Sequence, residues 1–360
     1  MPRRRKALGL VSGGLDSTLA LALMKEQDVD VEAVNFSTGF CFTDHHRAMS
    51  SPKHKLRNEA LRAGADLAVP VTVIDISKKY FDDVLLRPKH GYGANMNPCL
   101  DCRAYMLARA REHGDEIGAD FVFTGEVLGQ RPKSQFRKAL GIVAEESGLG
   151  DRLLRPLSAR LLPPTLPERE GWIDRSKLLA ISGRSRRIQI EEAARRGLDL
   201  DEIPQPAGGC CFLTDEAYAR KLEDWLGHQE EPKHDAEAFV LLKVGRHLRL
   251  NDGVKVIVGR DEAENRFLAG YRRGRWEFWA KDFTGPTVLV ESARDLYWEE
   301  IEAIGAITAR YGHGREQDAL TVCYRHPGGP EELLSMVDER PVEAVRVTPS
   351  RLEEIEPLRV

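Results

Sequence analysis

The sequence lacks any hydrophobic run that could cross a membrane. No stretch approaches the roughly 18 consecutive apolar residues that a membrane-spanning helix needs. The basic start, Met1–Lys6, is followed by only a short apolar run before Ser12 and Gly13. This run is too short for the apolar core of a secretory signal. We therefore expect a cytoplasmic protein without membrane contact.

Cysteine is also scarce, and the numbers of positively and negatively charged residues are nearly equal. Six cysteines in 360 residues exclude the disulfide framework of a small secreted domain, and four of them form two groups, Cys99/Cys102 and Cys210/Cys211. The net charge is −4, and the last 30 residues account for it, with eight acidic residues and four arginines. Any basic surface must therefore be local. No internal repeat or low-complexity tract is present.

The first 130 residues alternate between two hydrophobic periods. Short apolar runs predict strands at residues 7–11, 31–36, 71–76 and 121–124, and helical spacing predicts helices at 16–25, 54–65 and 102–113. This alternation is typical of the α/β class, and we expect a Rossmann-like, doubly wound parallel sheet. Such sheets bind ligands at the carboxyl ends of their strands.

The rest of the chain has a different pattern. A proline-rich segment, 155–168, precedes a helix with a basic start, 182–197. From Thr214 the pattern predicts helices at 215–226, 261–271 and 295–311, with strands at 239–244, 247–250, 254–258 and 287–291. We therefore expect a nucleotide-binding domain over residues 1–213, a small α+β domain over 214–330 and an acidic tail over 331–360.

The first strand ends in a glycine-containing hexapeptide, Ser12-Gly13-Gly14-Leu15-Asp16-Ser17. Two glycines allow a sharp turn with bare N–H groups, and the helix that follows offers its positive end to an anion. Ser12 and Ser17 add hydroxyl donors. Asp16 would repel a phosphate unless Mg²⁺ lay between them. The alternative is an ordinary turn in which Asp16 caps the helix.

The paired cysteines allow several interpretations. Pro98 favours a helix start at Cys99, and a helix N-terminus would lower the pKa values of the Cys99 and Cys102 thiols. Together with Cys210 or Cys211, these thiols could hold zinc, hold an iron–sulfur cluster, or carry a persulfide without metal. The cysteines could also be incidental. Cys41 could be a fourth ligand or a sulfur carrier, but its position between two phenylalanines favours a buried and inert residue, and we expect Cys323 to lie in the core.

Basic residues gather in two short stretches. Arg131 and Lys133 follow the run Thr124-Gly125-Glu126, and Arg184, Arg186 and Arg187 begin the basic helix. We expect all five to bind RNA, and the position of Arg131 and Lys133 beside the nucleotide loop favours contact with phosphate groups of ATP or RNA. For Arg195 and Arg196 we expect a solvated helix face.

The order of the motifs resembles one family over residues 6 to about 220. The motifs are SGGLDS (12–17), NPCLDCR (97–103), TGEVLGQRPKSQ (124–135), RPLSARLLPPTLPE (155–168), GWIDRSKLLAISGRSRRIQI (171–190) and PAGGCCFLTD (206–215). This pattern resembles the tRNA thiouridylase-type proteins of the ATP pyrophosphatase (PP-loop) superfamily. Residues 241–265 resemble the small RNA-binding module named after the NFACT proteins.

This resemblance implies a tRNA sulfurtransferase. ATP would adenylate a uridine carbonyl oxygen at C2 or C4, and sulfide or persulfide would then displace AMP. ATP and Mg²⁺ would bind at Ser12, Gly13, Gly14, Asp16 and Ser17, facing a second nucleotide loop of Thr124, Gly125 and Glu126. The catalytic residues would be Asp16, Cys99, Cys102, Cys210 and Cys211, with the cysteines as ligands of a 4Fe-4S cluster. The implied partners are tRNA and a sulfur donor, either sulfide or a cysteine desulfurase.

Two other functions remain open from the sequence. One is a PP-loop ligase or amidotransferase that adenylates a small molecule and holds structural zinc. The other is a non-catalytic RNA-binding protein with a degenerate ATP fold, against which the intact SGGLDS motif argues. If the cysteines serve catalysis, Cys99→Ala should abolish thiolation and leave ATP binding largely intact.

Overall fold

The computed structural model describes residues 3–41, 58–131, 134–201, 203, 211–281, 283–312, 320–336 and 345–346. The chain divides into two units, with the boundary between Cys211 and Phe212. Within the described residues, no helix is long and apolar enough to cross a membrane.

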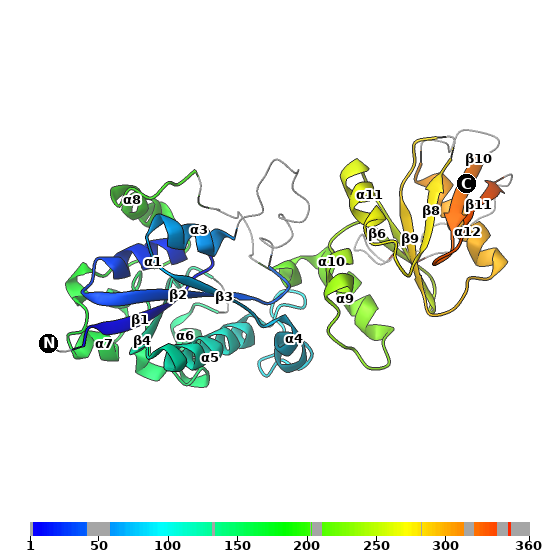
Figure 1. Ribbon diagram of the computed structural model, residues 1–360. Helices are drawn as coiled ribbons and strands as arrows, with labels where there is room; N and C mark the ends of the chain where they lie inside the picture. Colours follow the sequence, from blue (N-terminus) through cyan, green and yellow to red (C-terminus); the bar gives the residue numbers. More distant parts are fainter. Residues whose placement is uncertain are drawn as a thin grey trace. The chain divides into compact units, whose positions relative to one another are not determined.

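The first unit is built on a five-stranded parallel sheet (Figure 1). Its order is β3-β2-β1-β4-β5, so the chain starts in the middle and winds outward in both directions. This is the doubly wound topology that the alternating pattern predicted. The strands are β1 (Arg5–Leu10), β2 (Val29–Ser37), β3 (Val71–Asp75), β4 (Phe121–Thr124) and β5 (Leu153–Leu154).

Helices cover both faces of this sheet. Successive side chains of a strand point to opposite faces, and so Ala7 and Leu8 of β1 belong to two different hydrophobic clusters. One cluster includes residues of α1 (Leu15–Lys25), α3 (Glu59–Asp66) and α8 (Arg187–Arg195). The other includes residues of α5 (Cys99–Ile117) and α6 (Arg137–Glu146). The shorter helices of this unit are α4 (Ser77–Tyr80), which continues as a π-helical turn over Phe81–Leu85, and α7 (Leu166–Arg169).

The second unit contains a seven-stranded antiparallel sheet of order β11-β10-β8-β9-β7-β6-β12. Helix α12 (Trp298–Arg310) packs on one core cluster of this unit and α11 (Glu262–Ala269) on another. Helices α9 (Glu216–Gly227) and α10 (Ala236–Leu241) precede the sheet. Its strands are β6 (Arg246–Asn251), β7 (Val254–Val258), β8 (Trp276–Ala280), β9 (Val288–Ser292), β10 (Leu320–Arg325), β11 (Glu331–Met336) and β12 (Val345–Arg346).

Two expectations for this unit are corrected by the structure. Residues 239–244, expected as a strand, contain the end of α10 instead. The Asp235 side chain accepts a hydrogen bond from the Ala238 amide and so begins a helix there. Residues 331–336, assigned to the acidic tail, form β11 and pair with β10. Most of the remaining tail lies outside the described residues.

Candidate functional site

Four segments of the first unit follow the carboxyl ends of neighbouring strands. The hexapeptide 12–17 follows β1, Cys41 follows β2, Tyr80 follows β3, and Gly125 follows β4. Because these strands are parallel, their carboxyl ends meet at the same edge of the sheet (Figure 1). The sequence predicted a ligand site at this edge.

The glycines of the hexapeptide are required by its geometry. Gly13 has φ +79°, and a β-carbon there would lie 2.2 Å from the carbonyl carbon of Glu59. Gly14 is the N-cap of α1, so Asp16 does not cap this helix. The Ser17 hydroxyl donates to the Gly14 carbonyl oxygen at 3.0 Å and lies 3.3 Å from the Ser12 hydroxyl oxygen. The backbone N–H groups at the start of α1 are thereby available to an anion.

Asp16 lies among groups from two other segments. Gln130 Nε2 donates to Asp16 Oδ2 at 3.0 Å. Burial raises the pKa of Asp16, while the Gln130 hydrogen bond, the positive charges of Arg186 and Arg131, and the Gln189 amide oppose that rise. Asp16 Oδ1 is buried and accepts no hydrogen bond from the described residues. An unpaired carboxylate oxygen is a ligand that Mg²⁺ prefers, so this site fits the ion that the sequence predicted.

Gln189 was missed by the sequence analysis. It is fully buried on α8, although its neighbours Ile188 and Ile190 are exposed. Its position three residues after Arg186 places both side chains on the same face of the helix. No sequence signal distinguishes this glutamine from one on the exposed face, since only the packing of α8 beside α1 decides it.

The second nucleotide loop packs directly on the first. A β-carbon at Gly125 would lie 2.6 Å from the Asp16 carbonyl carbon and 2.6 Å from the Ser17 nitrogen. Thr124 is buried, and its hydroxyl donates to Glu126 Oε2 at 3.3 Å. The close approach of the two backbones therefore requires glycine at position 125.

Glu126 faces the protein interior. It is 2% exposed and accepts a hydrogen bond from Arg155 Nε at 2.9 Å. Burial acts to raise the pKa of Glu126, but the charges of Arg155 and Arg103 outweigh it and hold this pKa below its usual value. The resemblance implied a nucleotide-facing role, whereas this geometry makes the carboxylate an anchor of the loop.

Three cysteines, Cys41, Cys102 and Cys211, gather around the buried Tyr80, and Cys99 lies beside Cys102. Cys99 and Cys102 lie in the first turn of α5, which begins directly after Pro98 as predicted. Cys211 lies opposite Cys41 in an isolated antiparallel bridge. The Tyr80 side chain hydrogen-bonds to Cys102 and interacts electrostatically with Cys211 and Cys41. Cys210 lies outside the described residues.

The pKa of the Cys102 thiol differs from the value that the sequence predicted. Burial raises the pKa of Cys102 to about 12, so the predicted lowering by the helix N-terminus is wrong for this residue. The rings of Tyr80 and Tyr105 contact each other with centroids 6.3 Å apart, and Tyr80 hydrogen-bonds to the Cys102 thiol. A thiol in such surroundings loses its proton when a soft metal ion binds it.

The donor set fits a thiolate-bound metal by its chemistry, because soft thiolates suit both iron–sulfur clusters and zinc. Within the described part of the chain, no three cysteine, histidine or acidic side chains converge closely enough to hold a metal ion. The candidate ligands among the described residues are Cys99, Cys102 and Cys211.

The basic residues separate into two groups. Arg131 and Arg186 both act electrostatically on Asp16, which places them at the nucleotide end of the sheet. Arg184 is exposed, and Arg187 is exposed and pairs with Glu191 at 2.8 Å. Lys133 lies outside the described residues.

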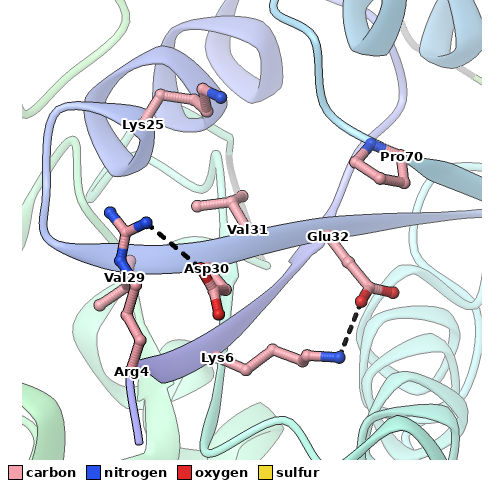
Figure 2. Close-up of a pocket in the computed structure, with 8 residues that line it drawn as sticks. All are labelled: Arg4, Lys6, Lys25, Val29, Asp30, Val31, Glu32 and Pro70. Carbon is pink, nitrogen blue, oxygen red and sulfur yellow. Dashed lines mark hydrogen bonds and ion pairs between the residues drawn. The ribbon is translucent and has the colours of Figure 1, made fainter. Parts of the chain in front are cut away.

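A pocket at the opposite end of the sheet does not belong to this site. Figure 2 shows the starts of β1 and β2, where the pocket is lined by Arg4, Lys6, Lys25, Val29, Asp30, Val31, Glu32 and Pro70. Lys6 pairs with Glu32 at 2.8 Å and Arg4 with Asp30 at 3.4 Å. Since β1 runs from Arg5 to Leu10 before it reaches the hexapeptide, the strand length separates this pocket from Asp16.

Two family models match the chain. The tRNA methyl transferase HUP domain matches residues 5–141, and the NFACT protein RNA binding domain matches residues 245–346. The first match lies in the first unit and the second match in the second unit. Together they confirm the two resemblances that the sequence motifs indicated.

Among curated relatives are proteins called tRNA-specific 2-thiouridylase MnmA. The protein from Nocardioides sp. is 25% identical over 288 residues, which cover 75% of this chain and 68% of the relative. The protein from Bacillus pumilus is 21% identical over 357 residues, which cover 93% of this chain and 88% of the relative.

Two solved structures are more distant. A 4-thiouridine synthetase–RNA complex with bound ATP has 20% identity and a TM-score of 0.39, covering 58% of this chain and 44% of its own. An NH3-dependent NAD synthetase from Campylobacter jejuni has 15% identity and a TM-score of 0.32, covering 68% of this chain and 83% of its own.

Proposed function

We propose that this chain, which resembles the tRNA thiouridylases, is an ATP-dependent tRNA sulfurtransferase. It adenylates a pyrimidine carbonyl of tRNA and replaces the carbonyl oxygen with sulfur. One observation carries this proposal: an intact phosphate loop around Asp16 lies at the same sheet edge as the cysteine group around Tyr80. An adenylating site and a sulfur-handling site are the two parts that the reaction needs.

ATP binds at the phosphate loop. Bare amides at the start of α1 contact its phosphates, and the unpaired Asp16 Oδ1 receives Mg²⁺. Arg131 and Arg186 neutralise the charge that builds up when pyrophosphate leaves. Gln130 holds the Asp16 carboxylate through the hydrogen bond from its Nε2.

The chemistry follows from the poor reactivity of a uracil carbonyl. Its oxygen attacks the α-phosphorus of ATP, pyrophosphate leaves, and the ring nitrogen loses its proton. A sulfur nucleophile then adds to the carbon, and AMP departs with the former carbonyl oxygen. Thiolate-type sulfur is strongly nucleophilic near neutral pH, and holding both reactants at one edge adds the advantage of proximity. The curated relatives are called 2-thiouridylases, and we place the reaction at C2 of a uridine.

Sulfur reaches the site through the cysteines. A 4Fe-4S cluster held by Cys99, Cys102 and either Cys210 or Cys211 would supply bound sulfide. A cysteine persulfide without metal is the alternative route, and zinc at the same residues would be structural. The donor is sulfide or a cysteine desulfurase.

The second unit binds the RNA. It contains the segment that matches the NFACT RNA-binding domain. In the first unit, the exposed Arg184 and Arg187, together with Lys133, provide phosphate contacts for the tRNA.

The test uses full-length protein purified and reconstituted without oxygen. It is incubated with ATP, Mg²⁺, sulfide and unmodified tRNA transcripts, and the digested RNA is analysed for thionucleosides by mass spectrometry. Asp16→Ala is the inactive control, and Cys323→Ser, in a core strand far along the sequence, is the active one. A new thiouridine supports the proposal. Release of pyrophosphate with a small acceptor, and no thionucleoside, would instead assign the protein to the small-molecule ligases.

A further inference from the structure

Two segments that lie side by side in the first unit contain no acidic residue. They are residues 127–144, which lead from β4 into α6, and residues 152–167. Arg137 Nη2 donates to the Leu161 carbonyl oxygen at 3.0 Å and so joins the two segments. In a chain whose net charge is −4, this part of the first unit is therefore locally basic.

Phe136 is the exposed aromatic residue of this basic region. Among the large apolar side chains described in the first unit, it has the largest exposed fraction, 55%. It directly precedes α6 as the N-cap residue of that helix. Single exposed rings are common on protein surfaces, so the groups around Phe136 decide what it can bind.

The backbone before Phe136 is tied to the nucleotide site. The Gly129 amide donates to the Gln135 carbonyl oxygen at 2.8 Å, which closes a short loop after β4. Gln130, the residue after Gly129, donates to Asp16 Oδ2 at 3.0 Å. The Gln135 side chain is buried and holds the other end of the loop. The exposed ring of Phe136 therefore lies at the same end of the sheet as the phosphate loop.

Exposed cations accompany this ring. Arg137 and Lys138 follow Phe136 directly, and Arg160 precedes the residue whose carbonyl oxygen Arg137 contacts. Among the described residues, neither Lys138 nor Arg160 pairs with an acidic side chain. Such cations bind phosphate groups of RNA and release their counterions. An aromatic ring stacks on an RNA base that is unpaired and turned outward, so the group fits a single-stranded stretch of RNA.

We propose that Phe136 stacks on an unpaired base of the tRNA beside the pyrimidine that reacts, while Arg137, Lys138 and Arg160 bind the neighbouring phosphates. The placement beside the reacting pyrimidine rests on the proposed function. The preference for an unpaired base rests on the residues themselves. Stacking adds a selection that phosphate contacts cannot supply, because phosphates are the same in paired and unpaired RNA.

The first test measures RNA binding without any activity. Full-length protein is titrated with labelled oligouridine and with a blunt RNA duplex of the same length, in the absence of ATP. We expect Phe136→Ala to weaken oligouridine binding about fivefold to a hundredfold, to leave duplex binding unaltered, and Phe136→Trp to restore it. Val73→Ala is the matched control, since Val73 is 43% exposed on β3, the opposite edge strand. Unchanged oligouridine binding by Phe136→Ala, or an equal loss for both RNAs, would overturn the stacking.

The cations are tested by their salt dependence. We expect the double variant Lys138→Gln, Arg160→Gln to bind both RNAs more weakly and to reduce the slope of log affinity against log salt by about one for each cation removed. Lys25→Gln is the control, because Lys25 is an exposed cation at the end of α1, at the opposite end of the sheet. An unaltered slope in the double variant would overturn the phosphate contacts.

The second test locates the stacked base on tRNA. A transcript containing 5-iodouridine, which couples on irradiation to an aromatic ring stacked on it, is bound to the full-length protein, and the linked peptides are mapped by mass spectrometry. We expect a link at Phe136 that Phe136→Leu abolishes. Links to other residues alone would overturn the stacking. Loss of ATP affinity in Phe136→Ala, with tRNA affinity unchanged, would place the ring on adenine and also overturn it.

The remaining outcomes separate this inference from the proposed function. If Phe136→Ala binds tRNA normally and loses thiolation only when a cysteine desulfurase replaces sulfide as donor, the surface binds a protein and the inference is overturned. If the unaltered protein links tRNA at Phe136 and forms no thionucleoside, the stacking stands and the proposed function is rejected. If it forms thionucleosides and Phe136→Ala does so with the same KM for tRNA, the proposed function stands and the stacking is rejected.

Discussion

Gly125 lies directly against the backbone of Asp16, so closely that a β-carbon on Gly125 would be 2.6 Å from the Asp16 carbonyl carbon. The loop after β4 and the loop after β1 are therefore held in one fixed relation. Gln130 reinforces it by donating to Asp16 Oδ2 at 3.0 Å. The position of the Asp16 carboxylate is thus set by two segments remote from it in sequence.

This contact predicts the effect of Gly125→Ala. The added methyl group must push the two loops apart, which we expect to cost about 1–3 kcal/mol of stability and to abolish ATP binding. Gly141→Ala is the matched control, because Gly141 lies within α6 and its β-carbon would meet nothing within 4 Å. Alanine there should stabilise the helix by about 0.5–1 kcal/mol. Equilibrium dialysis with ATP and thermal unfolding measure both effects, and normal ATP binding by Gly125→Ala would contradict the assignment of the loop.

Asp16→Asn separates catalysis from stability. Burial raises the pKa of Asp16, so ionising this carboxyl costs stability as pH rises from its unfolded value of 3.8 through the raised folded one. The isosteric amide removes that cost, and we expect a melting temperature at pH 7 equal to or above that of the unaltered protein. We also expect loss of AMP formation, because the amide is a poor Mg²⁺ ligand. A variant that still forms AMP at the normal rate would contradict this role.

Glu126→Gln should destabilise the first unit. The substitution leaves the Arg155 guanidinium, 6% exposed, without its counter-charge, which costs about 3–5 kcal/mol. Because the folded pKa of Glu126 lies below its usual 4.5, the stabilisation is present above pH 4.5 and is lost as pH falls through the folded value. Urea unfolding from pH 7 to pH 3 should therefore show a steeper acid loss in the unaltered protein than in the variant.

The same pair supplies its own control. Combining Glu126→Leu with Arg155→Met removes both charges and should recover part of the lost stability. If Glu126→Gln alone unfolds at the same urea concentration as the unaltered protein at pH 7, the buried ion pair does not stabilise the loop.

Arg186→Ala should weaken ATP binding more than tRNA binding. Arg186 acts electrostatically on Asp16, and a charged hydrogen bond to phosphate contributes about 1.5–3 kcal/mol. We expect the KM for ATP to rise about tenfold or more. Arg195→Ala on the same helix is the control, since Arg195 is exposed and pairs with Glu192 at 2.7 Å. A rise confined to the KM for tRNA, with a shallower salt dependence, would place Arg186 on the RNA instead.

The sequence predicted the first unit well, because its strands and helices are periodic and its glycine-rich turn is local. It could not predict the pairing of Cys41 with Cys211 or the burial of Gln189, since both depend on contacts between distant segments. The apolar run 239–244 fits a short strand or a buried helix equally well. The sequence predicted a lowered pKa for the Cys102 thiol from its place at a helix N-terminus. Burial of this thiol has the larger effect and raises the pKa, and burial could not be read from the sequence.

The most direct test of the central claim follows the carbonyl oxygen. Transcribed tRNA carrying oxygen-18 at either O2 or O4 of its uridines is incubated with the protein, ATP, Mg²⁺ and sulfide without oxygen, and the AMP produced is weighed by mass spectrometry. Adenylation at C2 predicts labelled AMP from the O2-labelled tRNA and unlabelled AMP from the O4-labelled tRNA. Unlabelled AMP from both tRNAs would show that no uridine carbonyl is adenylated and would contradict the account.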